Sequence, residues 1–177
     1  IEAKRHLFLH QNAFSRTVLG ADNETSASFA GDVRGECMTF SLEGKVEHGA
    51  YLREDGMLCF SFHGEDIEIL PKDEVVLPGI HNIANYLAAI CAVRGQVSDE
   101  VIRKVAASFG GVEHRIEFVR ELDGVRWYND SIATPPTRAI AGLRAFDRKI
   151  ILLAGGYDKK ISFEPLAPDI VERVSAL

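Results

Sequence analysis

Residues 149–156 have the sequence Lys-Ile-Ile-Leu-Leu-Ala-Gly-Gly, an unbroken apolar run that ends at a glycine pair. An apolar run without alternation is typical of a strand that is buried on both faces, as strands are in a parallel sheet covered by helices. The glycine pair allows the chain to turn sharply at the carboxyl end of this strand. We therefore expect residues 149–154 to lie in a parallel sheet of an α/β fold.

The segments around this run alternate between strands and helices. Strands are expected at 116–120 and 125–128, because Asp123-Gly124 between them favours the tight turn of a β-hairpin. A helix is expected from Pro136 to Phe146, since proline suits the first turn of a helix, and another near Phe163. The resulting order of strand, strand, helix, strand and helix is the beginning of a doubly wound sheet.

A different pattern precedes Pro78. Between Val33 and Val76, apolar and polar residues alternate and are interrupted by turn dipeptides such as Glu43-Gly44 and Asp55-Gly56. This combination predicts antiparallel hairpins. The segment 16–20 predicts a buried strand that ends in a turn.

Two helices are expected after Gly79. The first would bury Ile83, Leu87 and Ile90 on one face and end near Gly95.

The second helix would have Ser98 as its N-cap and end at Gly110-Gly111. This glycine pair is a candidate hinge, so we expect one domain over residues 1–111 and another over 112–177.

The composition excludes several classes of protein. Of 177 residues, 46% are apolar and 26% are charged, which is typical of a globular protein. The net charge of −6 and the lack of a basic stripe exclude a nucleic-acid partner. No apolar run could cross a bilayer, so we expect no membrane partner and a cytoplasmic location. The cysteines at 37, 59 and 91 are expected to be reduced core residues.

Candidate site residues follow the proposed hinge and the strand ends. His114-Arg115 offers an imidazole that could bind metal and a guanidinium that could bind phosphate, although such a pair is more often a surface ion pair. Asp130 and Ser131 end one strand, and Thr134 precedes a helix, at the position where doubly wound folds bind ligands. Helix capping by Ser131 or Thr134 would explain these residues equally well.

Three further positions carry weaker signals. Lys159 follows the glycine turn at 155–156 and would point into the same crevice, although a lysine near such a turn is common. Asn82 and Asn85 share one helix face, where two amides could bind a purine edge; an N-cap role for Asn82 would suffice instead. Lys4 by itself is an ordinary solvated charge.

Taken in order, these segments resemble the Mur ligase family. The similarity extends from the first residue to about Leu166 and rests on five segments: Glu2-Ala-Lys4, Gly79-Ile-His-Asn-Ile-Ala-Asn-Tyr-Leu-Ala-Ala89, Phe109-Gly-Gly-Val-Glu-His-Arg115, Tyr128-Asn-Asp-Ser-Ile-Ala-Thr134 and Gly155-Gly-Tyr-Asp-Lys159. The fourth segment resembles the D-glutamate-adding member, with Ile132 where a lysine is frequent and Pro135 where an asparagine is frequent.

The resemblance implies a fold and a reaction. The fold would be the latter part of the central ATPase domain, with hairpins and helices, followed by the start of a Rossmann-like C-terminal domain. In the reaction, ATP phosphorylates the carboxylate of UDP-N-acetylmuramoyl-L-alanine, and the amine of D-glutamate then attacks the acyl phosphate. ATP and Mg²⁺ are the implied cofactors, because both steps concentrate negative charge. A monomer is expected.

The resemblance also implies residue roles. Lys4, carbamylated by carbon dioxide, and His114 would bind magnesium. Asn82 and Asn85 would lie near adenine, while Arg115 and Asp130 would contact the phosphates and ribose.

Ser131, Thr134 and Lys159 would bind substrate on the D-glutamate side. Catalytic roles are implied for Lys4, His114 and Lys159.

Two alternatives remain open. A ligase similar to folylpolyglutamate synthetase would share the fold, the carbamylated lysine and the amide chemistry, but the residues after its hinge differ from Asn129-Asp130-Ser131. A non-catalytic nucleotide-binding module would keep the crevice without catalysis.

The family's P-loop, an acidic magnesium ligand and the UDP-binding domain all precede the position of Lys4, and the chain contains no Gly-x-x-x-x-Gly-Lys-Ser/Thr. The chain also lacks an initiating methionine, and we expect it to be a piece of a longer protein. We therefore expect the 177-residue polypeptide by itself to hydrolyse no ATP. A phosphate-release assay on the purified chain tests this, and measurable turnover would contradict it.

Overall fold

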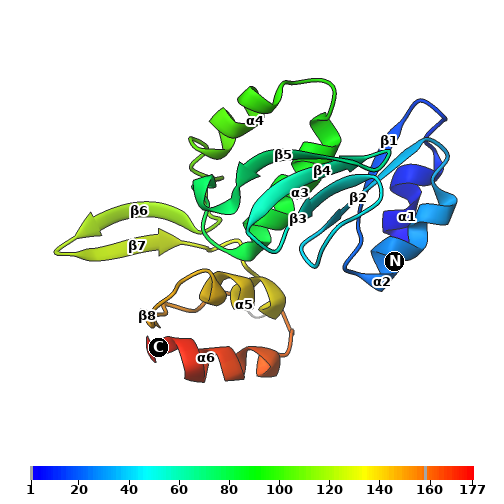
Figure 1. Ribbon diagram of the computed structural model, residues 1–177. Helices are drawn as coiled ribbons and strands as arrows, with labels where there is room; N and C mark the ends of the chain where they lie inside the picture. The colour runs from blue at the N-terminus through cyan, green and yellow to red at the C-terminus, as the bar shows by residue number, and fades with distance from the viewer. Residues whose placement is uncertain (1, 158) are drawn as a thin grey trace. The chain divides into compact units, whose positions relative to one another are not determined.

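The computed structural model describes residues 2–157 and 159–177 and has an α/β fold (Figure 1). The chain divides into two compact units. Unit 1 contains the residues up to Val76 together with Asn82–Ser108, and unit 2 contains Leu77–His81 and Phe109–Leu177. Among the described residues, no helix is long and apolar enough to span a membrane.

Unit 1 contains a five-stranded mixed sheet in the order β1-β2-β3-β4-β5. Its first three strands run parallel, and β4 and β5 pair antiparallel. The strands are β1 (Arg16–Gly20), β2 (Glu36–Ser41), β3 (Gly49–Leu52), β4 (Met57–Phe62) and β5 (Glu65–Pro71). The strand predicted at 16–20 is confirmed, with Thr17 and Leu19 buried.

The prediction of antiparallel hairpins between Val33 and Val76 is wrong for one pair of strands. β2 and β3 pair parallel, with Thr39 opposite Gly49 and Ser41 opposite Tyr51. After β2 ends at Ser41, the chain has to come back only to the level of Thr39 before β3 begins at Gly49. This return is two residues along the strand direction, roughly 7 Å. The loop 42–48 covers this distance without a helix. Alternation shows which face of a strand is buried, but it does not fix the direction of the neighbouring strand.

Unit 1 also contains α-helices and short 3₁₀ helices. They are α1 (Glu2–Leu9), α2 (Glu24–Ala27), η1 (Ser28–Asp32), η2 (Lys72–Glu74), α3 (Ile80–Val93) and α4 (Asp99–Ala106). Figure 1 shows α3 running along one face of the sheet. Its predicted apolar face is confirmed, because Ile83, Leu87 and Ile90 are all buried.

Helix α4 begins as predicted but ends early. The Ser98 hydroxyl accepts a hydrogen bond from the Val101 N–H, as an N-cap does. The helix ends at Ala106 rather than at Gly110-Gly111. One reason is that the Ser108 hydroxyl donates to the Lys104 carbonyl at 2.7 Å and thereby competes with the backbone hydrogen bonds of a further turn.

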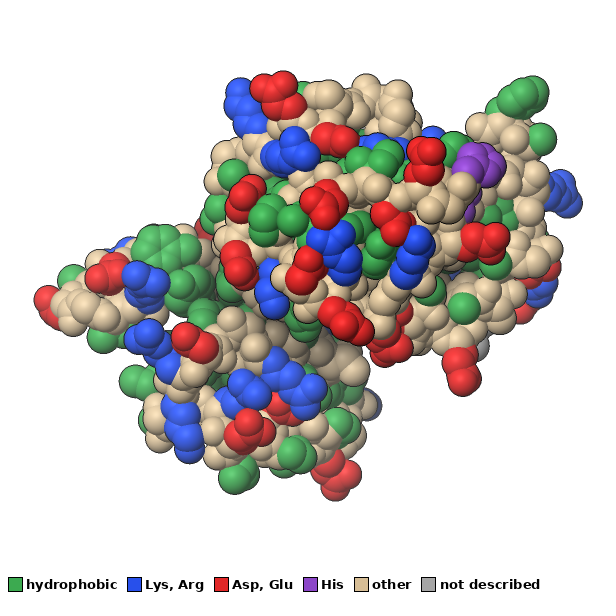
Figure 2. All heavy atoms as spheres, in the orientation of Figure 1, with side chains coloured by type: hydrophobic (Ala, Val, Ile, Leu, Met, Phe, Trp, Pro, Cys, Tyr) green, Lys and Arg blue, Asp and Glu red, His purple; other side chains and the backbone are tan. Residues whose placement is uncertain are grey.

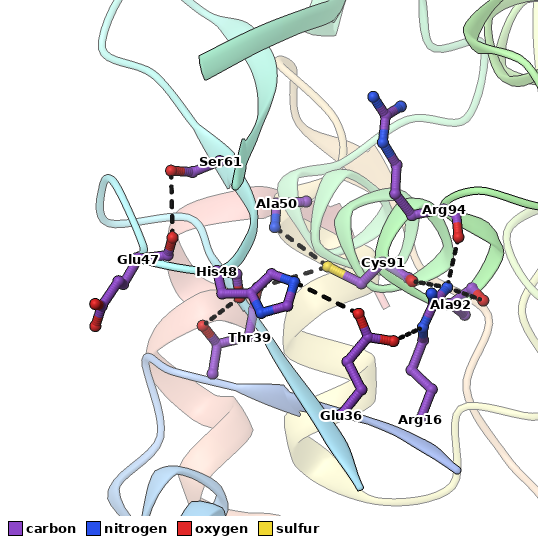
Figure 3. A network of polar contacts seen from close by, with 10 residues as sticks. All are labelled: Arg16, Glu36, Thr39, Glu47, His48, Ala50, Ser61, Cys91, Ala92 and Arg94. Carbon is purple, nitrogen blue, oxygen red and sulfur yellow. Dashed lines mark hydrogen bonds and ion pairs between the residues drawn. The ribbon is translucent and has the colours of Figure 1, made fainter. Parts of the chain in front are cut away.

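A polar network joins α3 to the parallel strands (Figure 3). The Arg16 guanidinium on β1 donates to three carbonyls at the end of α3, those of Cys91 at 3.1 Å, Ala92 at 3.2 Å and Arg94 at 2.7 Å. Arg16 also binds Glu36 of β2 at 2.7 Å. A cation at these carbonyls satisfies groups that have no partner within the helix, and it complements the negative end of the helix dipole.

Cys91 extends this network into the core. Its sulfur accepts a hydrogen bond from the Ala50 N–H at 3.2 Å and donates to the Thr39 carbonyl, so that α3 contacts both β2 and β3 (Figure 3). Burial raises the pKa of Cys91 to about 11. All three cysteines are free, as predicted, although Cys37 is only partly buried.

Unit 2 contains two small sheets and two helices. A hairpin of β6 (Glu117–Leu122) and β7 (Val125–Asn129) is followed by α5 (Pro136–Arg144), β8 (Ile150–Ile151), η3 (Glu164–Leu166), α6 (Ala167–Arg173) and β9 (Val174–Ala176). The predicted turn at Asp123-Gly124 is confirmed, because both residues have the positive φ, 51° and 78°, of the tight hairpin turn. Helix α5 ends two residues earlier than expected.

The prediction for residues 149–154 is only partly confirmed. β8 pairs parallel with β9, a strand that was not expected, but it contains only two residues. Ile151 is 68% exposed and Leu153 is 79% exposed, so the expected burial on both faces is wrong. The physical reason is that, within the described residues, β8 has a single neighbouring strand, and burial on both faces of a strand requires a wider sheet covered by helices.

Glycine is required at position 49 because β2 and β3 approach closely. A Cβ atom at Gly49 would lie 1.8 Å from the Thr39 carbonyl oxygen. Gly44 has a similar φ, 149° against 144°, but a Cβ there would meet nothing within 4 Å. Gly49→Ala should therefore lower the free energy of unfolding by about 3 kcal/mol or more, and Gly44→Ala by only about 1 kcal/mol. Urea unfolding followed by circular dichroism measures both, and equal losses would contradict the close approach.

Candidate functional site

The junction that follows the glycine pair 110–111 has an unusual backbone. His114 and Ile116 have φ values of 65° and 45°. Positive φ is uncommon for histidine and unfavourable for a β-branched residue, at a cost of about 1–3 kcal/mol. Ile116 is nevertheless buried, and its N–H donates to the Asp130 carboxylate at 3.1 Å. The strained turn is therefore held by a carboxylate at the end of β7.

Asp130 is half-buried against helix α5. A Cβ atom at Gly142 would lie 2.8 Å from Asp130 Oδ2, so glycine is what allows the helix to approach the carboxylate. Burial raises the pKa of Asp130, while the Ile116 N–H, His81, Arg115 and Arg138 act in the opposite direction. The carboxylate therefore lies among several positive or donating groups of unit 2.

His81 belongs to the same electrostatic environment. Burial lowers the pKa of its imidazole, Arg115 lowers it further, and Asp130 partly offsets both effects. Arg115, Asp130 and His81 are thus close enough to influence one another. The sequence interpretation gave His81 no role. Its position between Gly79 and Asn82, in a segment that carries the family resemblance, was the available signal.

His114 is held by the hairpin. Its ring Nδ1 lies 2.8 Å from Asn129 Nδ2. Its backbone N–H donates to Glu117 Oε2 at 2.8 Å. The Ile132 N–H donates to the His114 carbonyl at 3.3 Å. One ring nitrogen is therefore occupied by Asn129. Neither Asn129 nor Glu117 was predicted as a site residue, since their roles depend on the pairing of β6 with β7.

Thr134 and Lys159 are brought together although they lie 25 residues apart. Lys159 Nζ donates to Thr134 Oγ1 at 3.3 Å, and both groups are accessible to solvent. The Ser131 N–H donates to Asn129 Oδ1 at 3.1 Å. Helix α5 has Pro135 as its N-cap and no side-chain capping bond, so the alternative of capping by Ser131 or Thr134 is not supported.

The candidate residues of unit 1 form two separate groups. At the start of α3, Asn85 Nδ2 donates to Asn82 Oδ1 at 3.3 Å, with Asn82 buried and Asn85 exposed. Because α3 begins at Ile80, Asn82 is not its N-cap.

Lys4 on α1 lines an open hollow of about 320 Å³ between α1, β1 and α2. Other polar side chains of this hollow are Gln11, Arg16, Thr17 and Ser26. In the part of the chain that the structure describes, no three His, Cys, Asp or Glu side chains are grouped closely enough to hold a metal ion. On the face shown in Figure 2, acidic and basic side chains are interspersed, so anionic ligands would depend on individually placed cations.

Comparison with known proteins supports the family resemblance. Residues 1–93 match the Mur ligase middle domain. The chain belongs to the Mur ligase family. This Mur ligase chain is 50% identical over 177 residues to a UDP-N-acetylmuramoylalanine--D-glutamate ligase of Acetivibrio thermocellus, of which it spans 38%. It is also 50% identical over 167 residues to the protein of the same name from Clostridium beijerinckii, of which it spans 35%.

Solved structures with the same fold include further Mur ligases. MurF from Acinetobacter baumannii has a TM-score of 0.61 and 20% identity, over 81% of this chain and 32% of that one. A murein peptide ligase from Psychrobacter arcticus has a TM-score of 0.58 and 19% identity, over 95% of this chain and 38% of that one. At this identity the likeness concerns the fold, and it confirms the predicted α/β class.

The hydrogen bond from Ile116 to Asp130 predicts a local effect of mutation. Asp130→Ala should speed amide hydrogen exchange at Ile116 by about ten-fold or more, because the buried N–H loses its acceptor. Asp130→Asn should retain most of the protection, since its side-chain oxygen can accept the same bond. The exposed Asp147→Ala is the control. Unchanged protection in Asp130→Ala would show that the carboxylate does not hold this turn.

Proposed function

We propose that this chain is part of an ATP-dependent ligase that adds D-glutamate to UDP-N-acetylmuramoyl-L-alanine in cytoplasmic peptidoglycan precursor synthesis. The observation that carries the proposal is the 50% identity over the whole chain to a UDP-N-acetylmuramoylalanine--D-glutamate ligase. Within the proposal, residues 1–111 are the latter part of the central ATP-binding domain. Residues 112–177 begin the C-terminal domain.

The proposed reaction forms an acyl phosphate and then an amide. The substrate carboxylate attacks the γ-phosphorus of ATP and releases ADP, and the amine of D-glutamate then displaces phosphate from the acyl carbon. Negative charge accumulates on phosphate oxygens in the first step and on the acyl oxygen in the second. The protein therefore has to supply hydrogen-bond donors and cations at defined places.

Nucleotide binding is assigned to Asn82, Asn85, Arg115 and Asp130. Asn85 uses one N–H of its amide for Asn82, and its second N–H and its Oδ1 are a donor and an acceptor that suit a purine base. Arg115 offers a planar guanidinium for phosphate oxygens. Asp130 offers a second carboxylate oxygen for a ribose hydroxyl, because one oxygen is already bound to the Ile116 N–H.

Substrate binding is assigned to Ser131, Thr134 and Lys159. The contact between Lys159 and Thr134 places a cation and a hydroxyl side by side on unit 2. This pair suits a carboxylate, which accepts hydrogen bonds from both groups. D-Glutamate supplies such carboxylates, and its amine has to remain uncharged in order to attack.

Magnesium would neutralise phosphate charge when bound. Lys4, as a carbamate, is the residue of this chain that we assign to it, because a carbamate oxygen suits a hard cation and Lys4 opens onto the hollow beside β1. The magnesium role that the resemblance implies for His114 would have to use Nε2, because Asn129 occupies its Nδ1.

Substrate assays distinguish this proposal from its alternatives. The complete ligase that contains this chain should form product with D-glutamate and UDP-N-acetylmuramoyl-L-alanine. Product with L-glutamate and a folate would favour the folylpolyglutamate synthetase alternative. ATP binding without either product would favour the non-catalytic module.

The role of Lys159 predicts a selective kinetic defect. In the complete ligase, Lys159→Ala should raise the KM for D-glutamate by about ten-fold or more, because a charge-assisted hydrogen bond contributes about 1.5–3 kcal/mol. The KM for ATP should change little. Steady-state kinetics with each substrate varied in turn measures both constants.

The exposed Lys149→Ala is the matched control, since it removes the same charge from another part of unit 2. It should leave both KM values near those of the unaltered ligase. Equal increases for D-glutamate and ATP in Lys159→Ala would argue against the assigned role.

A further inference from the structure

The side chain of Asn129 makes three hydrogen bonds that fix its orientation. Its Oδ1 accepts from the Ser131 N–H at 3.1 Å. Its Nδ2 lies 3.2 Å from Glu117 Oε2 and 2.8 Å from His114 Nδ1. The amide nitrogen has two hydrogens, and it therefore has one for each of these two partners.

The reverse orientation of this amide is unfavourable. Exchanging the oxygen and the nitrogen would direct an N–H of Asn129 at the Ser131 N–H, so that two donors would face each other. It would also place the Asn129 oxygen against the Glu117 carboxylate, so that two acceptors would face each other. A backbone N–H and a carboxylate cannot change roles, and they therefore decide the orientation.

The orientation of Asn129 determines which nitrogen of His114 carries the proton. Since Asn129 donates to Nδ1, Nδ1 is an acceptor and has no hydrogen. In a neutral imidazole the hydrogen then lies on Nε2. We infer that His114 is held as the Nε2–H form and acts as a hydrogen-bond donor to an anionic oxygen of a bound ligand, not as a magnesium ligand.

A metal ligand needs an unprotonated ring nitrogen, and His114 offers none that is accessible. Nδ1 is occupied by Asn129, and Nε2 carries the hydrogen. In metal sites the remaining ring nitrogen of a histidine ligand commonly donates to a carboxylate or a carbonyl, which leaves the other nitrogen free for the metal. The Asn129 amide donates a hydrogen bond to Nδ1 instead of accepting one from it. It therefore selects the form with the hydrogen on Nε2.

The backbone also fixes the direction of the His114 ring. The backbone N–H of His114 donates to Glu117 Oε2 at 2.8 Å, and the backbone carbonyl of His114 accepts from the Ile132 N–H at 3.3 Å. Arg115 follows His114 directly in the chain and adds a positive charge to this segment. Asn129 and Glu117 are therefore positioning residues, and the fitting ligand class is a phosphate or carboxylate. Only this choice of ligand rests on the proposed function.

The form of His114 can be measured directly on the 177-residue chain. With ¹⁵N-labelled histidine, long-range ¹H–¹⁵N correlation spectra distinguish protonated from unprotonated ring nitrogens, and His114→Gln assigns the signals. We expect a protonated Nε2 and an unprotonated Nδ1 near neutral pH. A protonated Nδ1 would overturn the inference. This measurement requires no ligase activity, so its result is independent of the proposed function.

Asn129→Asp, made together with Glu117→Gln so that two carboxylates do not face each other, tests whether Asn129 imposes this form. Glu117→Gln alone should leave the proton on Nε2. A carboxylate retains the acceptor for Ser131 but accepts from Nδ1–H, and the proton should therefore move to Nδ1. Asn85→Asp makes the same chemical change in unit 1 and should leave the His114 signals unchanged. Unchanged signals in the double variant would show that Asn129 does not position the ring.

The metal role can be tested separately in the complete ligase. If His114 donates to an anionic ligand, His114→Gln should raise the KM for one of the anionic substrates. The Mg²⁺ concentration for half-maximal activity should stay within about two-fold. Loss of a metal ligand would instead raise that concentration by about ten-fold or more, since even residues behind a ligand contribute 10- to 100-fold to metal affinity. Such an increase would overturn the inference.

Discussion

The contact on which unit 1 depends is that of the Arg16 guanidinium with the end of helix α3. One side chain satisfies three helix carbonyls and binds Glu36, and it thereby joins α3 to β1 and β2. Cys91 then joins the same helix to β2 and β3. Because a helix is stiff, fixing its last turn also sets the position of its first turns, where Asn82 and Asn85 lie. The candidate adenine site therefore rests on packing at the opposite end of the helix.

Unit 2 depends on a comparable constraint at Asp130. One carboxylate holds the strained Ile116 backbone and lies against α5, whose glycine at position 142 leaves room for it. Burial disfavours the charged form of this carboxylate, and nearby donors and cations partly compensate. Backbone strain and a buried charge both reduce stability. Their occurrence beside His114, Arg115 and His81 is consistent with a site selected for binding rather than for stability.

The two candidate binding groups of unit 2 use similar chemistry. Lys159 with Thr134 combines a cation with a neutral hydroxyl, and Arg115 follows the imidazole of His114 in the chain. Such pairs suit carboxylates and phosphates, which offer several acceptor oxygens on one group. In a chain with a net charge of −6, binding of anions depends on these local arrangements and not on a general attraction.

Local rules determined much of this protein from sequence. The strand at 16–20, the apolar face of α3, the Ser98 N-cap and the turn at Asp123-Gly124 each depend on residues close together in the chain, and all were predicted. The family resemblance rests on the order of five short segments along the chain. The tertiary structure decided the parallel pairing of β2 with β3, the exposure of Ile151, the support of Ile116 by Asp130 and the orientation of the His114 ring. These features depend on which distant segments meet, and neither periodicity nor residue spacing specifies a partner strand or the direction of a hydrogen bond.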